Sequence, residues 1–120
     1  MRRRSLLCSL ALLPVVVTGP VAAQQRRYVA GLEDVPLAPG LASPEAPTSF
    51  DSPQGRIVIT YAQGAADRAG VLAFYSASLP QLGWRREEET LFRREGESLR
   101  LEFGPPGRVL TVRFTLAPVL

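Results

Sequence analysis

Apolar residues in the second half of the chain recur with two different periods. Between residues 71 and 82 they appear every three or four positions, which is the spacing of one face of an α-helix. These residues are Val71, Leu72, Tyr75, Leu79 and Leu82, with Phe74 on the flank. The pattern predicts a helix that starts near Ala65. Pro80 should kink or shorten its last turn, and Gly83 should end it. Trp84 is then expected to close the end of the core, with its indole N–H bonded to an acceptor.

Strand patterns lie on both sides of this helix. Residues 56–62 (RIVITYA) are rich in β-branched and aromatic side chains. Residues 89–95 form another candidate strand, and residues 98–103 and 108–116 alternate apolar with polar side chains. Such alternation is typical of antiparallel strands with one covered face. We therefore predict an α+β fold of two layers, in which one helix packs on a four- to five-stranded antiparallel sheet in the order β-α-β-β-β.

Residues 35–53 (VPLAPGLASPEAPTSFDSP) contain five prolines. Proline removes a backbone donor and fixes φ, so regular helix is excluded and a central strand is disfavoured. We predict an extended Pro-rich arm over residues 24–54, followed by a folded domain over residues 55–120. Two alternatives stay open for the arm. Its apolar side chains Val35, Leu37, Leu41 and Phe50 pin it to the domain, or it is a loose linker.

The beginning of the chain has the three parts of a secretory signal peptide. Arginines at positions 2–4 precede an apolar stretch at 6–17, and small residues at 21–23 suit cleavage after Ala23. Pro14 and other breakers interrupt the apolar stretch before the roughly 20 residues of a membrane-spanning helix. We therefore predict a cleaved signal peptide over residues 1–23, no transmembrane segment in the mature protein, and a periplasmic or secreted location.

Two details of this signal affect how the chain is exported. Residues 3–7 (RRSLL) loosely fit a twin-arginine signal, so both this route and ordinary secretion stay open. Cys8 lies before the apolar stretch and not at the cleavage site. A lipid anchor on this cysteine is therefore not expected.

Cleavage changes the composition of the protein. The chain has 14 basic and 11 acidic residues, and removing the three arginines at positions 2–4 leaves 11 of each. The basic balance thus belongs to the signal, and no nucleic-acid partner is expected. Removing 23 of the 120 residues leaves 97, which is enough for one small domain. These 97 residues contain no Cys, His or Lys.

This composition removes most catalytic groups. Without His and Cys, the common general base, the thiol nucleophile and the usual zinc ligands are missing. Ser76 and Ser78 have no activating base and are interpreted as small packing residues. The glutamates at 87–89 are interpreted as an ion-paired hairpin and not as a calcium site. An enzyme would need carboxylates alone, as in glycoside hydrolysis, with Asp67 and the glutamates as candidates by elimination. We predict no enzyme activity, no metal site and no cofactor.

Three arginines form a candidate anion-binding site. Arg56, Arg100 and Arg113 are all expected on the uncovered face of the sheet. The guanidinium group binds phosphate and carboxylate in pairs of hydrogen bonds, which would suit a small anionic ligand or a lipid headgroup. The alternative is cross-strand pairing with Glu102 and its neighbours.

The outer side of the predicted helix is a candidate partner-contact face. Residues 69–84 carry no charge, and the positions opposite the apolar stripe include Ala66, Ala69, Ala73 and Ala77. A surface helix usually carries charged residues there. This face would suit contact with the Pro-rich arm, with a second copy of the chain or with an envelope protein. The alternative is that alanine is present as the best helix former.

Four stretches of the sequence carry a resemblance. DVPLAPGL, FDSPQGRI, FYSASLPQLGW and LFRREGESLRLEF resemble small exported proteins of Gram-negative bacteria, especially alphaproteobacteria, to which no activity is assigned. This resemblance implies an exported address and a fold but no reaction. The order helix–LGW–strands is also similar to helix-and-sheet modules of envelope lipoproteins that assist outer-membrane protein assembly. This chain lacks their lipidated cysteine, and no site residues carry over from either group.

Together these features predict a non-enzymatic periplasmic interaction module that acts in cell-envelope protein assembly or maintenance. The alternative is a binder of a small anionic ligand or lipid headgroup on the exposed sheet face. The sequence leaves open the partner, the ligand and the oligomeric state.

Overall fold

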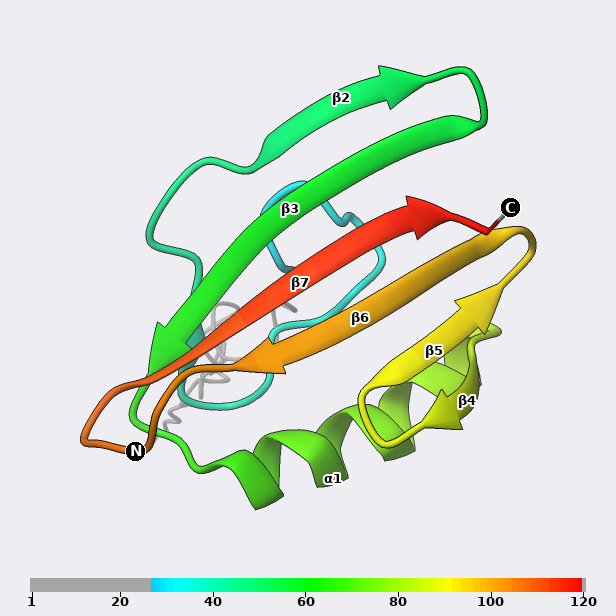
Figure 1. Ribbon diagram of the computed structural model, residues 1–120. Helices are drawn as coiled ribbons and strands as arrows, with labels where there is room; N and C mark the ends of the chain where they lie inside the picture. The colour runs from blue at the N-terminus through cyan, green and yellow to red at the C-terminus, as the bar shows by residue number, and fades with distance from the viewer. Residues whose placement is uncertain (1–26, 120) are drawn as a thin grey trace, which may run out of the picture.

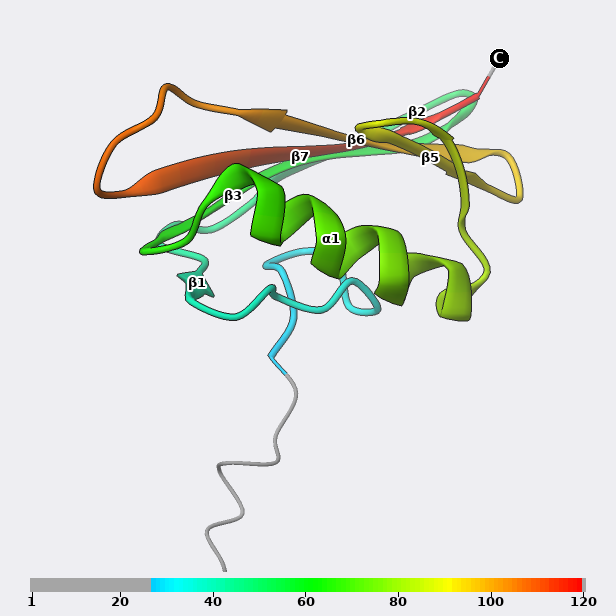
Figure 2. The same ribbon diagram turned by 90° about the horizontal axis from the view of Figure 1, so that it is seen from below.

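The computed structural model describes residues 27–119. It shows a single α-helix packed on one face of a large antiparallel sheet, so the predicted α+β class is confirmed (Figure 1; Figure 2). The predicted signal peptide and its cleavage site lie outside the described residues. Within residues 27–119, no helix has the length and apolar character needed to cross a membrane.

The sheet has seven strands in the described part of the chain, more than the four to five predicted. They are β1 (Leu41–Ala42), β2 (Thr48–Ser52), β3 (Gly55–Gly64), β4 (Arg85–Glu88), β5 (Leu91–Arg94), β6 (Glu97–Phe103) and β7 (Leu110–Pro118). Their order is β1-β3-β7-β6-β5-β4, and β2 pairs with β3 on the same edge as β1. Three strands precede the helix and four follow it, so the predicted β-α-β-β-β order is incomplete. The additional strands are β1 and β2, which come from the Pro-rich segment, and β4, which follows Trp84.

Strands β3, β7 and β6 form the centre of the sheet, and their side chains alternate between two environments. Val58 of β3 lies opposite Leu116 of β7, which lies opposite Leu99 of β6, and all three are buried under the helix layer. The inward apolar positions predicted in β6 and β7 are therefore confirmed. In residues 27–119 no helix or loop covers the opposite face of the sheet (Figure 2).

Helix α1 (Arg68–Ser78) begins later than the sequence pattern predicts, because Asp67 caps it. The Asp67 carboxylate accepts a hydrogen bond from the Gly70 N–H at 3.0 Å, which satisfies one of the unpaired donors at a helix start. The buried stripe consists of Val71, Tyr75 and Leu79.

The end of the helix tightens into the 3₁₀ turn η2 (Leu79–Leu82), with Pro80 in its first turn, and Gly83 ends it at φ 95° as expected. A 3₁₀ turn rotates the chain further per residue than an α-helix does. Leu82 therefore leaves the buried stripe and is 36% exposed, so its predicted place in the core is wrong.

The Pro-rich segment is pinned to the domain and is not a loose linker. Its buried side chains belong to the same core as the helix and sheet, and they are Val29, Leu32, Val35, Ala38 and Leu41. The segment runs beside α1 beneath the sheet (Figure 2). It turns back on itself at the start, where the Val29 N–H donates to the Val35 carbonyl at 2.9 Å. Phe50, one of the expected pins, is 49% exposed on β2.

Trp84 closes one end of the core, as predicted, and is 3% exposed. Its indole N–H has no hydrogen-bond partner in residues 27–119, contrary to expectation. Instead, the Arg94 guanidinium lies 4.3 Å from the centre of the Trp84 ring. Arg94 also donates to the Leu82 carbonyl at 3.0 Å and forms an ion pair with Asp34 at 2.7 Å. One side chain of β5 therefore joins the helix end to the Pro-rich segment.

Candidate functional site

Tyr75 fixes the distance between the helix and the Pro-rich segment. Its hydroxyl donates to the Pro36 carbonyl at 2.7 Å and accepts from the Ala38 N–H at 3.2 Å. Its ring packs edge-on against Phe74 and Phe114, with centroids 4.9 and 5.6 Å away. Burial raises the pKa of the Tyr75 hydroxyl far above its ordinary value, and the bond from Ala38 lowers it by less. The hydroxyl therefore stays protonated and continues to donate to Pro36.

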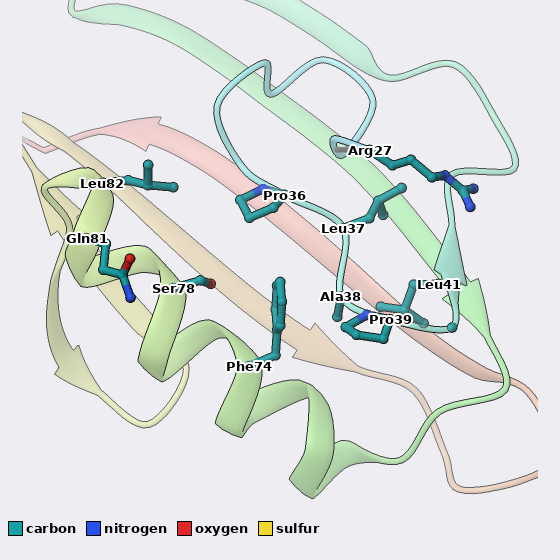
Figure 3. A pocket seen from close by; sticks show the side chains of 11 residues that line it. Arg27, Pro36, Leu37, Ala38, Pro39, Leu41, Phe74, Ser78, Gln81 and Leu82 are labelled. Atoms are coloured by element: carbon teal, nitrogen blue, oxygen red, sulfur yellow. The ribbon is translucent and has the colours of Figure 1, made fainter. Parts of the chain in front are cut away.

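A hollow of about 580 Å³ lies between these two elements (Figure 3). The helix side supplies Phe74, Ser78, Gln81 and Leu82, and residues 36–41 supply the opposite wall. Leu82, which the 3₁₀ turn leaves exposed, lies at one end of the hollow, across from Pro36 (Figure 3). Arg27 stands at the rim, beyond Leu37 (Figure 3). The size and apolar lining are in the range of ligand-binding pockets.

A second hollow of about 500 Å³ continues toward the start of the helix. It shares Ala38, Pro39 and Phe74 with the first hollow, and its further lining includes Ala66 and Ala73. The two hollows thus adjoin along α1, with Ala38, Pro39 and Phe74 in the walls of both. We call the pair the helix groove. Arg27 and Asp67 are the charged residues in its lining. The groove is therefore suited to apolar molecules or segments.

Ser78 supplies a polar group to the wall of this groove. Its hydroxyl oxygen is buried and has no hydrogen-bond partner among residues 27–119. A buried hydroxyl without a partner costs about 1–3 kcal/mol. Ser76, by contrast, donates to the Ala73 carbonyl at 3.2 Å. The sequence indicated a packing role for both serines, because nothing in the local pattern shows that residues 36–41 lie opposite Ser78.

The structure divides the predicted alanine face. Ala69, Ala73 and Ala77 are exposed, whereas Ala66 is partly buried and packs against the core. Ala66 and Ala73 line the helix groove, and Ala69 and Ala77 are not among its lining residues. The Pro-rich segment lies close to Ala66 at Gly40 and leaves Ala69, Ala73 and Ala77 exposed. The alternative in which this segment covers the alanine face therefore applies to Ala66 alone.

Two of the three predicted anion-binding arginines lie on the uncovered face of the sheet. Arg100 stands between Leu91 and Thr115 on neighbouring strands, and Arg113 stands opposite Glu102. The Arg113 guanidinium is already engaged, because its Nε donates to a Glu102 carboxylate oxygen at 2.6 Å. Hydrogen bonds to Glu102 and then Tyr61 raise the pKa of Arg113.

Arg56 is separated from this pair. It lies two residues before the buried Val58 on β3, so both side chains leave the sheet on the helix-covered side. There it pairs with Glu97 at 3.7 Å. The prediction that all three arginines share the uncovered face is wrong for Arg56. For Arg113, the cross-strand pairing alternative describes the structure.

The three glutamates at 87–89 lie at the β4–β5 hairpin. Glu87 pairs with Arg93 at 2.8 Å and with Arg85 at 3.4 Å, and Glu89 pairs with Arg68 at 3.2 Å. These contacts agree with an ion-paired hairpin. Across residues 27–119, no three His, Cys, Asp or Glu side chains come together as a metal ion would require.

The helix groove therefore combines two adjoining hollows with a charged residue in the lining of each, Arg27 and Asp67. Such a lining offers burial of apolar surface and a polar group at each end. No protein-family model, curated protein or solved structure matches this chain.

Proposed function

We propose that the protein is a non-enzymatic interaction module of the cell envelope that binds an apolar segment of a partner protein in the helix groove. The observation that carries this proposal is the pair of adjoining hollows along α1, which share Ala38, Pro39 and Phe74 in their walls. The envelope location rests on the signal peptide predicted from the sequence.

The groove has the physical properties of a segment-binding site. The two hydrogen bonds of Tyr75 fix the separation between the helix and the Pro-rich segment, so a partner meets a preformed surface. The partly exposed Phe74 and Leu82 would lose water contact when a segment binds. Each square ångström of apolar surface removed from water contributes roughly 25 cal/mol. Amphipathic helices commonly bind hydrophobic grooves in this way.

The alternative of an anionic ligand on the sheet face has weaker support. Arg113 already bonds Glu102, and Arg56 lies on the other side of the sheet. An anion bound at Arg113 would therefore have to break the ion pair with Glu102. It would also contact fewer arginines than the three that the sequence pattern predicts.

Substitution of Ala73 by arginine tests the groove. Ala73 is exposed, so the change should leave folding intact, while its long charged side chain would enter the second hollow. A loss of about 1.4 kcal/mol in binding corresponds to a tenfold lower affinity. We expect crosslinking in intact envelopes, followed by co-purification with the tagged protein, to recover at least about tenfold less partner with Ala73→Arg.

Ala69→Arg is the matched control. It introduces the same side chain one helical turn earlier, at an exposed position outside the groove lining. Recovery with Ala69→Arg should equal that of the wild type. An equal loss with both variants would assign binding to the whole alanine face, and no loss with Ala73→Arg would contradict the groove proposal.

A further inference from the structure

Strand β2 (Thr48–Ser52) occupies an edge of the sheet that lacks the usual protection. Its one pairing partner in residues 27–119 is β3, and its outward side faces no strand in that range. The opposite edge, β4, has four charged residues and a register shift, which are common devices against edge-to-edge pairing. Strand β2 has one charged residue, Asp51, and no proline. It is therefore the edge at which another strand can add.

The turn after β2 determines which backbone groups face outward. Residues 53 and 54 form a two-residue connection, and Ser52 pairs with Gly55 across it. A two-residue hairpin closes on a hydrogen-bonded pair, and such pairs alternate along an antiparallel ladder. Phe50 therefore directs its backbone groups to Ile57 of β3. Ser49 and Asp51 direct theirs to the outer edge, where they offer two donors and two acceptors.

We propose that β2 pairs antiparallel with β2 of a second copy of this chain, about a two-fold axis that passes beside Phe50. In this register Ser49 lies opposite Asp51 of the second copy, and Thr48 lies opposite Ser52. The two outward residues then exchange backbone hydrogen bonds with each other. A serine hydroxyl also faces each carboxylate, so no like charges meet. A dimer interface of this kind uses the same patch on both subunits.

Neighbouring registers are less favourable. In a two-fold pairing that keeps each side chain on its own face, the axis must pass beside a residue of β2. The neighbouring registers therefore have the axis at Ser49 or at Asp51. An axis at Asp51 would place two carboxylates opposite each other, which destabilises a strand pair. An axis at Ser49 would place Pro47 opposite Asp51, and proline has no N–H to donate. The Phe50 register pairs all five residues and leaves Pro47 and Pro53 just outside the ladder.

The side chains on the uncovered face support the same pairing. Phe50 is 49% exposed, and its neighbour across the ladder is the half-buried Ile57. In the dimer the two Phe50 residues form a non-hydrogen-bonded pair, the kind of pair in which facing side chains approach most closely. The pairing would therefore remove an exposed aromatic side chain from water. The helix groove lies on the opposite face of the sheet and stays open.

Single cysteines can measure this register. In the full-length chain with Cys8→Ser, Phe50→Cys places two thiols directly opposite each other across the two-fold axis. Facing Cβ atoms lie about 4.5–5.5 Å apart, near the spacing that a disulfide needs. Thr48→Cys, at an exposed position on the same face, is the matched control. Its two copies stand four residues apart along the ladder, or about 13 Å.

Under mild oxidation we expect Phe50→Cys to form a disulfide-linked dimer, and Thr48→Cys to remain almost entirely unlinked. Equal crosslinking of the two variants would overturn the register. Sedimentation tests the dimer without an introduced cysteine. The wild type should show twice the mass of one chain, and Phe50→Arg, which places two positive charges together, should show the mass of one chain with unchanged circular dichroism. A wild type that stays monomeric up to its solubility limit would overturn the proposal.

Discussion

The Tyr75 hydroxyl connects the helix to two backbone groups of the Pro-rich segment, the Pro36 carbonyl and the Ala38 N–H. Tyr75→Phe would keep the ring contacts with Phe74 and Phe114 but leave both backbone groups without this partner. A buried group that loses its hydrogen bond costs about 1–3 kcal/mol. We expect Tyr75→Phe to lower the free energy of unfolding by about 2 kcal/mol, measured by urea denaturation.

Ser76→Ala is a suitable control on the same helix. The Ser76 hydroxyl bonds only to the Ala73 carbonyl one turn earlier, at a partly exposed position. Its removal should change the free energy of unfolding by no more than about 0.5 kcal/mol. If Tyr75→Phe were equally harmless, the two hydrogen bonds would not determine the position of the Pro-rich segment.

Individual residues differ in how well the sequence predicted their place. Tyr75 was recognised as a core residue because its neighbours in the helical stripe are local. The partners of its hydroxyl lie 37 and 39 residues away, and no local pattern points to them. Arg56 was assigned to the wrong face because three apolar residues follow it in succession. Alternation alone does not decide which of them face the helix.

At the scale of elements, strands β1 and β3 approach each other closely where the Pro-rich segment joins the sheet. A Cβ atom on Gly64 would lie 1.8 Å from the Gly40 carbonyl oxygen. Gly64→Ala must therefore push β1 away from β3. Overpacking of this kind costs about 1–3 kcal/mol, and we expect a loss near the upper end because the obstacle is backbone. Denaturant unfolding would measure it. So would hydrogen exchange at Leu41, whose N–H donates to the Ala38 carbonyl at 3.1 Å next to this contact.

Gly107→Ala provides the comparison for this change. Beyond Gly107 itself and its two chain neighbours, a Cβ atom at this position would meet no described atom within 4 Å. We therefore expect the unfolding free energy of Gly107→Ala to stay within about 0.5 kcal/mol of the wild type. Faster exchange at Leu41 only in Gly64→Ala would locate the damage at the turn from Ala38 to Leu41, which lies beside the β1–β3 contact. Similar behaviour of the two variants would contradict the close approach.

The elements missed by the sequence are those with little local signal. The helix and strands β3, β6 and β7 were predicted because their apolar residues follow one clear period. Strands β1 and β2 were missed because prolines surround them, although β2 lies between Pro47 and Pro53 and contains neither. The helix groove was missed for a related reason. It exists only because residues 36–41 lie against the helix, and this contact joins distant parts of the chain.

At the scale of the whole molecule, the core draws on both sides of the boundary predicted between residues 54 and 55. Val29, Leu32, Val35 and Leu41 are each at most 3% exposed within it. Burying one such side chain contributes roughly 1.5–3 kcal/mol, whereas a whole domain is stable by only about 5–15 kcal/mol. A fragment of residues 55–120 would lose all four contributions and would expose the inner flank of α1 to water.

We therefore expect residues 55–120 alone to show no cooperative thermal transition, whereas residues 24–120 unfold in a single one, as followed by near- and far-ultraviolet circular dichroism. The longer chain contains every described residue and is the direct control. A fragment with its own sharp transition would show that the sheet and helix fold independently. The Pro-rich segment would then be an arm docked on a finished domain, and the helix groove would form only after that docking.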